Sequence, residues 1–167
     1  MVAASQPRKA PSFSAQRKSG RRAPRRAQCV LIVDDSVHVR EMYAEYLDYR
    51  GFRVMCAADG NGGIQLAISV QPDVIVMDLA MPNVDGFDAT RTLKRHSRTS
   101  RIPIVILTGY SDVATLKQGA SQAGADMFLA KPCLPEDLER HVRSLLERQP
   151  RKLKNQPAGA ALQRRLA

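Results

Sequence analysis

The chain has 167 residues, of which 26 are lysine or arginine and 16 are aspartate or glutamate, so its formal net charge is +10. This length favours one domain, and 44% hydrophobic with 25% charged residues is typical of a soluble globular protein. No apolar run approaches the ~18 residues of a transmembrane helix, and the N-terminus lacks the apolar core of a secretory signal. We therefore expect a cytoplasmic protein.

The excess positive charge lies in the two ends of the chain. Residues 1–28 contain eight basic residues and no acid, and residues 149–167 contain five more and again no acid. The middle therefore has the remaining 13 basic residues against all 16 acids. Because neither end shows apolar periodicity, we interpret both as basic, mostly disordered tails around a domain at 29–148. The tails could bind phosphates of nucleic acid or of an anionic membrane, or could simply be solvated.

Between the tails, strand-like and helix-like segments alternate five times. Continuous apolar runs such as Cys29–Val33 are typical of strands buried on both faces, and the helical segments have apolar residues at a spacing of three to four. The expected strands are 29–33, 52–57, 73–78, 102–107 and 126–130. The expected helices are 36–50, a weaker one that begins within 59–63 and ends near residue 70, then 87–96, 112–123 and 135–148. Ser36 suits the N-cap of the first helix and Gly51 suits its stop. The alternation predicts an α/β protein with a parallel, doubly wound five-stranded sheet.

The three cysteines form an odd set without a recognisable pattern, which argues against a disulfide framework or a zinc site. Cys29 and Cys56 flank strand-like runs, so we expect both to be small buried apolar residues.

Polar residues follow four of the predicted strands. They are Asp34-Asp35, Asp78, Thr108 and Lys131-Pro132. The carboxyl ends of parallel strands meet at one edge of a sheet, where ligands bind. Three carboxylates in one crevice repel each other unless a cation lies among them, and hard oxygen ligands suit Mg²⁺.

The same residues could carry phosphoryl transfer. A carboxylate can act as a nucleophile and form an aspartyl phosphate, which suits Asp78. A lysine ammonium such as that of Lys131 can hold a phosphoryl oxygen, and the hydroxyl of Thr108 can donate to another.

Residues 29–148 resemble the receiver domain of bacterial two-component response regulators. The resemblance rests on motifs that occur in the family's order at the right strand ends: Asp34-Asp35, Asp78 with Met81-Pro82 and Asp85-Gly86, Thr108-Gly109, and Lys131-Pro132. It implies a CheY-like, flavodoxin-like fold with strand order 2-1-3-4-5. It also implies that Asp78 accepts a phosphoryl group from a histidine kinase or a histidine phosphotransfer protein.

The resemblance assigns a role to each motif. Mg²⁺ would be bound by Asp35 directly, by Asp34 mainly through water, by Asp78 and by the backbone carbonyl of Ala80. Lys131 would bind the phosphoryl group, and Thr108 and Phe128 would be the switch pair. Many family members have Tyr where Phe128 stands, so a partner contact that needs this hydroxyl is not expected. Ala80 offers no side chain to steer an attacking water, so we expect a long-lived phosphoryl group.

These inferences lead to a stand-alone response regulator that catalyses only its own phosphorylation and dephosphorylation. Its output would pass to a downstream protein through the face formed by residues 112–123, 126–130 and 135–148, as a monomer or a phosphorylation-dependent dimer. One alternative is a phosphorylation-controlled nucleic-acid or membrane tether that acts through the basic tails. Another is a hydrolase with an aspartyl-phosphate intermediate. A haloacid-dehalogenase-like site, however, expects Asp-x-Asp after the first strand, and Asp34-Asp35-Ser36 stands there.

Overall fold

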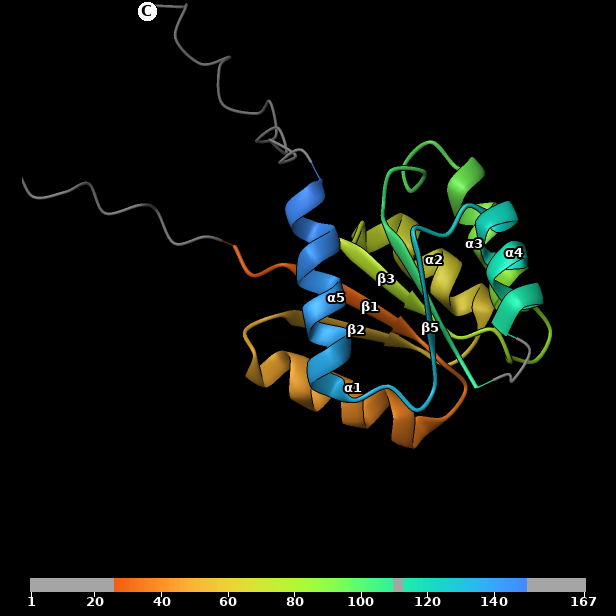
Figure 1. The fold of residues 1–167 in the computed structure, drawn as a ribbon. Coiled ribbons are helices and arrows are strands. Elements are labelled where there is room, and N and C mark those ends of the chain that lie inside the picture. The colour runs from red at the N-terminus through yellow and green to blue at the C-terminus, as the bar shows by residue number, and fades with distance from the viewer. Residues whose placement is uncertain (1–25, 110–112, 150–167) are drawn as a thin grey trace, which may run out of the picture.

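The computed structural model describes residues 26–109 and 113–149, which form five strands and five helices in strict alternation (Figure 1). Most of both predicted tails lies outside these residues. The elements are β1 (Cys29–Val33), α1 (Val37–Tyr49), β2 (Arg53–Ala57), α2 (Gly60–Val70), β3 (Val74–Met77), α3 (Gly86–Arg95), β4 (Ile104–Thr108), α4 (Val113–Ala123), β5 (Met127–Ala130) and α5 (Pro135–Arg148). None of the helices in the described ranges is long and apolar enough to cross a membrane.

The strands form one parallel sheet in the order β2-β1-β3-β4-β5, which confirms the predicted fold. Helices α1 and α5 cover one face of this sheet, and α2, α3 and α4 cover the other (Figure 1). The central strands β1, β3 and β4 are buried along their whole length, as their continuous apolar sequences predict. The edge strands β2 and β5 are only partly buried.

The position of β2 at the edge overturns one expectation about the cysteines. Cys29 is buried in β1, as predicted, but Cys56 is exposed, so its predicted burial is wrong. An apolar run looks the same in a central and in an edge strand, and only the strand order decides how much of it is covered.

The glycine-rich start of α2 has a packing reason. Asp59 caps the helix, because its carboxylate accepts a hydrogen bond from the Gly62 amide at 2.8 Å. A Cβ on Gly63 would lie 2.8 Å from a methyl carbon of Val33, so the helix can approach β1 only with glycine there. Ser36 does precede α1 as predicted, but its side chain makes no capping hydrogen bond.

Helices α1 and α5 are joined by a nearly buried carboxylate, Glu139, which is 5% exposed. Glu139 accepts hydrogen bonds from Arg50 at 2.9 Å, from Arg143 at 2.8 Å and from the Tyr46 hydroxyl at 3.1 Å. Arg143 also lies over the ring of Phe52, 4.6 Å from its centroid. Burial alone would raise the pKa of Glu139. The hydrogen bonds from Arg143, Arg50 and Tyr46 outweigh this effect, so the pKa of Glu139 is lowered.

Candidate functional site

The main chain brings the four predicted polar strand ends to one edge of the sheet. The Asp78 amide donates to Val33 O at 2.8 Å, so the end of β3 lies beside the end of β1. The Lys131 amide donates to Thr108 O at 2.8 Å, which joins the end of β5 to that of β4. Because β1, β3 and β4 are neighbours in the sheet, the side chains that follow them face one crevice.

Lys131 lies between the two buried carboxylates of this crevice. Asp34 is 3% exposed and Asp78 is 5% exposed. The Lys131 ammonium donates a hydrogen bond to Asp34 Oδ2 at 2.7 Å and lies 3.3 Å from Asp78 Oδ1. Among the described residues, Asp78 Oδ1 is buried and has no hydrogen-bond partner. A buried carboxylate oxygen in this state is open to a cation or to an electrophile.

The pKa values of Asp78 and Lys131 are shifted by burial and by the charges around them. Burial raises the pKa of the Asp78 carboxyl, the ammonium of Lys131 opposes this, and the charge of Asp34 reinforces it. Burial alone would lower the pKa of Lys131. The hydrogen bond to Asp34 and the charge of Asp78 outweigh that effect and raise it, so Lys131 stays charged at neutral pH.

The donor set fits a hard divalent cation. Asp34, Asp35 and Asp78 each offer a carboxylate oxygen, and the three oxygens lie within 4.8 Å of one another. Three ionised carboxylates and one ammonium leave two negative charges, which Mg²⁺ would balance. Asp34 is already engaged through both oxygens, because Oδ1 accepts from the Ser36 amide at 2.9 Å and Oδ2 accepts from Lys131. Asp35 is exposed beside them.

The loop after Asp78 explains two further motifs. Asp85 caps α3 by accepting a hydrogen bond from the Asp88 amide at 2.8 Å. A Cβ on Gly86 would lie 2.1 Å from the carbonyl oxygen of Asp78, so only glycine allows the loop to close over the site residue. Ala80 lies exposed in this loop, and its role as a carbonyl ligand stays a prediction.

The two predicted switch residues lie on the same face of the sheet. Thr108 is the last residue of β4, fully buried, and not the first residue after the strand as predicted. Phe128 pairs with Ile106, and Thr108 pairs with Ala130, so their side chains share the face that α3 and α4 cover. The ring of Phe128 is partly buried against a small cluster of Leu79, Ile106 and Ala120. Their coupling stays a prediction.

Sequence reasoning missed one residue that supports the site. The Arg40 guanidinium donates a hydrogen bond to the carbonyl oxygen of Asp34 at 2.6 Å and so ties the first turn of α1 to the acid pair. The only feature of the sequence that could have indicated this contact is a basic residue in the first turn of the helix that follows Asp34-Asp35. An arginine at that spacing is also common on solvated helix faces, so the pattern alone did not distinguish the two roles.

Comparisons with known proteins agree with this geometry. The family model described as the response regulator receiver domain matches residues 30–143. The chain is 39% identical over 119 residues to the DNA-binding dual master transcriptional regulator RpaA of Synechocystis, over 71% of this chain and 49% of that protein. It is 38% identical over 117 residues to protein PilH of Pseudomonas aeruginosa, over 70% of this chain and 96% of that protein.

Solved structures of response regulators are also similar to this chain. The chemotaxis protein CheY4 of Vibrio cholerae is 33% identical, with a TM-score of 0.67 over 71% of this chain and 98% of that chain. A putative response regulator from Chloroflexus aurantiacus is also 33% identical, with a TM-score of 0.70 over 74% of this chain and all of that chain. The chain spans about half the length of RpaA and of the similar ycf27 regulators. The chain belongs to the response regulator receiver domain family.

Proposed function

We propose that Asp78 accepts a phosphoryl group from a histidine kinase or a histidine phosphotransfer protein. The observation that carries this proposal is the buried Asp78 Oδ1, which lies 3.3 Å from the Lys131 ammonium and accepts no hydrogen bond from the part of the chain that the structure describes. In the transfer, this carboxylate forms a bond to phosphorus while the phosphorus–nitrogen bond of the donor phosphohistidine breaks. The electron pair of that bond returns to the imidazole nitrogen, which takes up a proton from water.

The acidic cluster would hold Mg²⁺ for this reaction. Asp35 and Asp78 would bind the ion directly with the Ala80 carbonyl, and Asp34 would act mainly through water, because both of its oxygens are engaged. When bound, Mg²⁺ neutralises charge between the carboxylates and the phosphoryl oxygens. Lys131 would turn its ammonium to a phosphoryl oxygen, and the Thr108 hydroxyl would donate to another.

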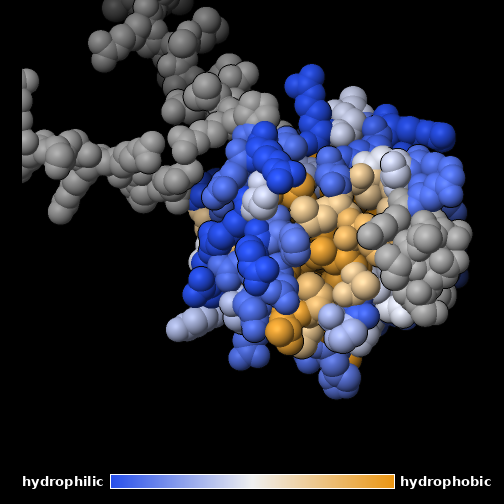
Figure 2. All heavy atoms as spheres, in the orientation of Figure 1, coloured by the Kyte–Doolittle hydropathy of each residue, from blue (hydrophilic) through white to orange (hydrophobic). Residues whose placement is uncertain are grey.

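The output would leave through the face formed by α4, β5 and α5. In Figure 2 hydrophobic residues gather between α5 and α4 on this side of the molecule. Strand β5 lies there, and its Met127, Phe128 and Leu129 are only partly buried. Movement of Phe128 after a change at Thr108 would alter this surface for a downstream protein or for a second copy. The protein would thus be a signalling protein without turnover of an external substrate.

The test is labelling with a small phosphoryl donor and Mg²⁺, together with binding of beryllofluoride. We expect Asp78→Asn to abolish both while the circular dichroism spectrum stays unchanged. The matched control is Asp88→Asn at an exposed position of α3, which removes the same charge and should keep both the labelling and the beryllofluoride binding. Labelling retained in Asp78→Asn would refute the assignment. Loss of the label from the unaltered protein within seconds would contradict the long lifetime expected from Ala80.

A second function rests on where the described chain begins and ends. Arg26 and Gln149 line the same hollow of about 550 Å³, together with Gly51 and Arg143, at the end of the domain away from Asp78. The two ends of the described chain therefore lie at one place, and the basic residues of 1–25 and 150–167 are joined to them, which favours a tether for phosphate-bearing polymers or surfaces. Binding of the full chain to duplex DNA and to anionic vesicles across a salt series tests this. No salt-dependent binding to either would refute it.

A further inference from the structure

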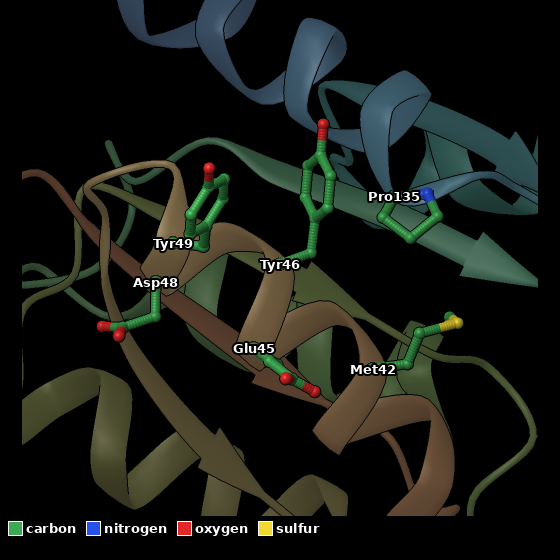
Figure 3. A pocket seen from close by; sticks show the side chains of 6 residues that line it. All are labelled: Met42, Glu45, Tyr46, Asp48, Tyr49 and Pro135. Carbon is green, nitrogen blue, oxygen red and sulfur yellow. The ribbon is translucent and has the colours of Figure 1, made fainter.

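A groove of about 720 Å³ lies along α1, beside the start of α5 and outside the Asp78 site (Figure 3). Six residues line it: Met42, Glu45, Tyr46, Asp48, Tyr49 and Pro135. Four of them follow the spacing i, i+3, i+4 and i+7 along α1, so they form one continuous stripe of that helix. Pro135, the first residue of α5, forms the opposite wall.

The apolar part of this groove is uncovered in the described part of the chain. Tyr49 is 84% exposed and Met42 is 43% exposed, at the two ends of the stripe. Leu134 does not line the groove, but it precedes Pro135 in the chain and is also exposed. Single exposed apolar residues are common, but a set that shares one groove is typical of a surface that another segment covers.

The polar part of the groove is acidic and not neutralised. Glu45 and Asp48 are exposed and form no ion pair with the side chains of residues 26–109 and 118–149. The two arginines of the α1–α5 contact, Arg50 and Arg143, are already bound to Glu139. An occupant of matching chemistry would therefore be basic and would bring apolar side chains for the stripe.

We propose that residues 150–167 of this same chain dock into the groove. This segment has five basic residues and no acid, and it has three leucines, Leu153, Leu162 and Leu166. Residues 1–25 have no leucine and only Phe13 as an aromatic residue, so they match the apolar stripe less well. The proposal does not depend on phosphorylation of Asp78.

The reach of the segment is sufficient. It begins where α5 ends, and α5 is a wall of the groove. The 14 residues of α5 span about 21 Å, whereas 18 residues in extended form span up to about 60 Å. The two helices lie along each other, since contacts run in the same order along both: Tyr43 to Cys133, Tyr46 to Glu139, and Arg50, just after α1, to Arg143. The segment can therefore turn back along α5 and pass over α1.

Tethering makes even a weak contact effective. A short flexible link gives an effective concentration on the order of millimolar, so docking would be substantially populated when the isolated segment binds with a Kd of about 1 mM. Part of the attraction comes from exposed charges, which salt screens over about 10 Å at 0.1 M. Docking should thus weaken as ionic strength rises, and it should not depend on protein concentration.

The chain contains no tryptophan, so a single one reports on the segment alone. In the full-length Leu162→Trp protein, we expect acrylamide quenching to be at least about twofold slower than in a 150–167 peptide with the same substitution. Adding Glu45→Gln with Asp48→Asn should restore peptide-like quenching, as should about 0.5 M salt. The matched control, Asp88→Asn with Glu147→Gln, removes two exposed acids elsewhere and should keep the protection.

Three results would overturn the proposal. Peptide-like quenching in the starting protein would mean that the segment is not docked, provided that a Leu166→Trp reporter gives the same result. Equal protection in the groove and control variants would mean that the segment binds elsewhere. Protection that grows with protein concentration would mean that the groove receives the segment of a second copy.

Discussion

Replacing Lys131 by methionine tests how much the Lys131 ammonium stabilises the buried carboxylates of the site when Mg²⁺ is absent. Lys131 is the cation that contacts both buried carboxylates, at 2.7 Å from Asp34 Oδ2 and 3.3 Å from Asp78 Oδ1. Removing one partner of a fully buried ion pair costs about 3–5 kcal/mol. Because the Lys131 side chain is 23% exposed, water can reach part of the gap, and we expect a loss of about 2–3 kcal/mol in the free energy of unfolding.

Added Mg²⁺ should reduce the difference in unfolding free energy between Lys131→Met and the unaltered protein. The variant leaves three carboxylates without an ammonium, so its site should bind the cation more tightly than the site of the unaltered protein. Binding at ten times Kd stabilises a folded protein by about 1.4 kcal/mol, and a lower Kd gives the variant a larger gain at the same Mg²⁺ concentration.

The assay is urea unfolding at pH 7 with and without Mg²⁺, read as a midpoint shift at constant slope. Lys94→Met is the matched control. Lys94 binds Asp126 at 2.7 Å in a more exposed pair, so its loss should be about 1 kcal/mol and should not respond to Mg²⁺. This prediction is contradicted if Lys131→Met loses no more unfolding free energy than Lys94→Met, or if Mg²⁺ leaves the loss in Lys131→Met unchanged.

Two further predictions concern the supports of the site and of the α1–α5 contact. Glu139→Gln should lose about 1–3 kcal/mol of unfolding free energy at pH 7. Because folding lowers the pKa of Glu139, its contribution is present above the unfolded value of about 4.3 and is lost as the pH falls through the folded value. The difference in unfolding free energy between Glu139→Gln and the unaltered protein should therefore be smaller in urea melts near pH 3 than at pH 7. The same difference at both pH values would contradict this prediction. Gly86→Ala should lose about 1–3 kcal/mol and weaken Mg²⁺ binding, because its Cβ would meet the Asp78 carbonyl oxygen at 2.1 Å. Gly109→Ala, where a Cβ meets open space, is its control, and equal losses would exclude the steric explanation.

The local pattern of the sequence determined the order of the elements and the positions of the polar strand ends. Apolar runs such as Cys29–Val33 and the caps around them depend on neighbours within a few residues, so they can be read directly. Helix α5 begins and ends where the pattern predicts, and most other elements differ by one or two residues. Because parallel strands share one carboxyl edge, these local patterns also predicted that Asp34, Asp78 and Lys131 would meet.

The tertiary structure decided how the residues are paired and covered. Strand order put β2 at the edge and exposed Cys56, although its sequence resembles that of a buried strand. The packing of α1 on α5 buried Glu139 between two arginines and left Tyr49 uncovered. The α1–α5 contact joins residues about 90 positions apart, and no periodicity within one element encodes which side chain of another element will lie against it.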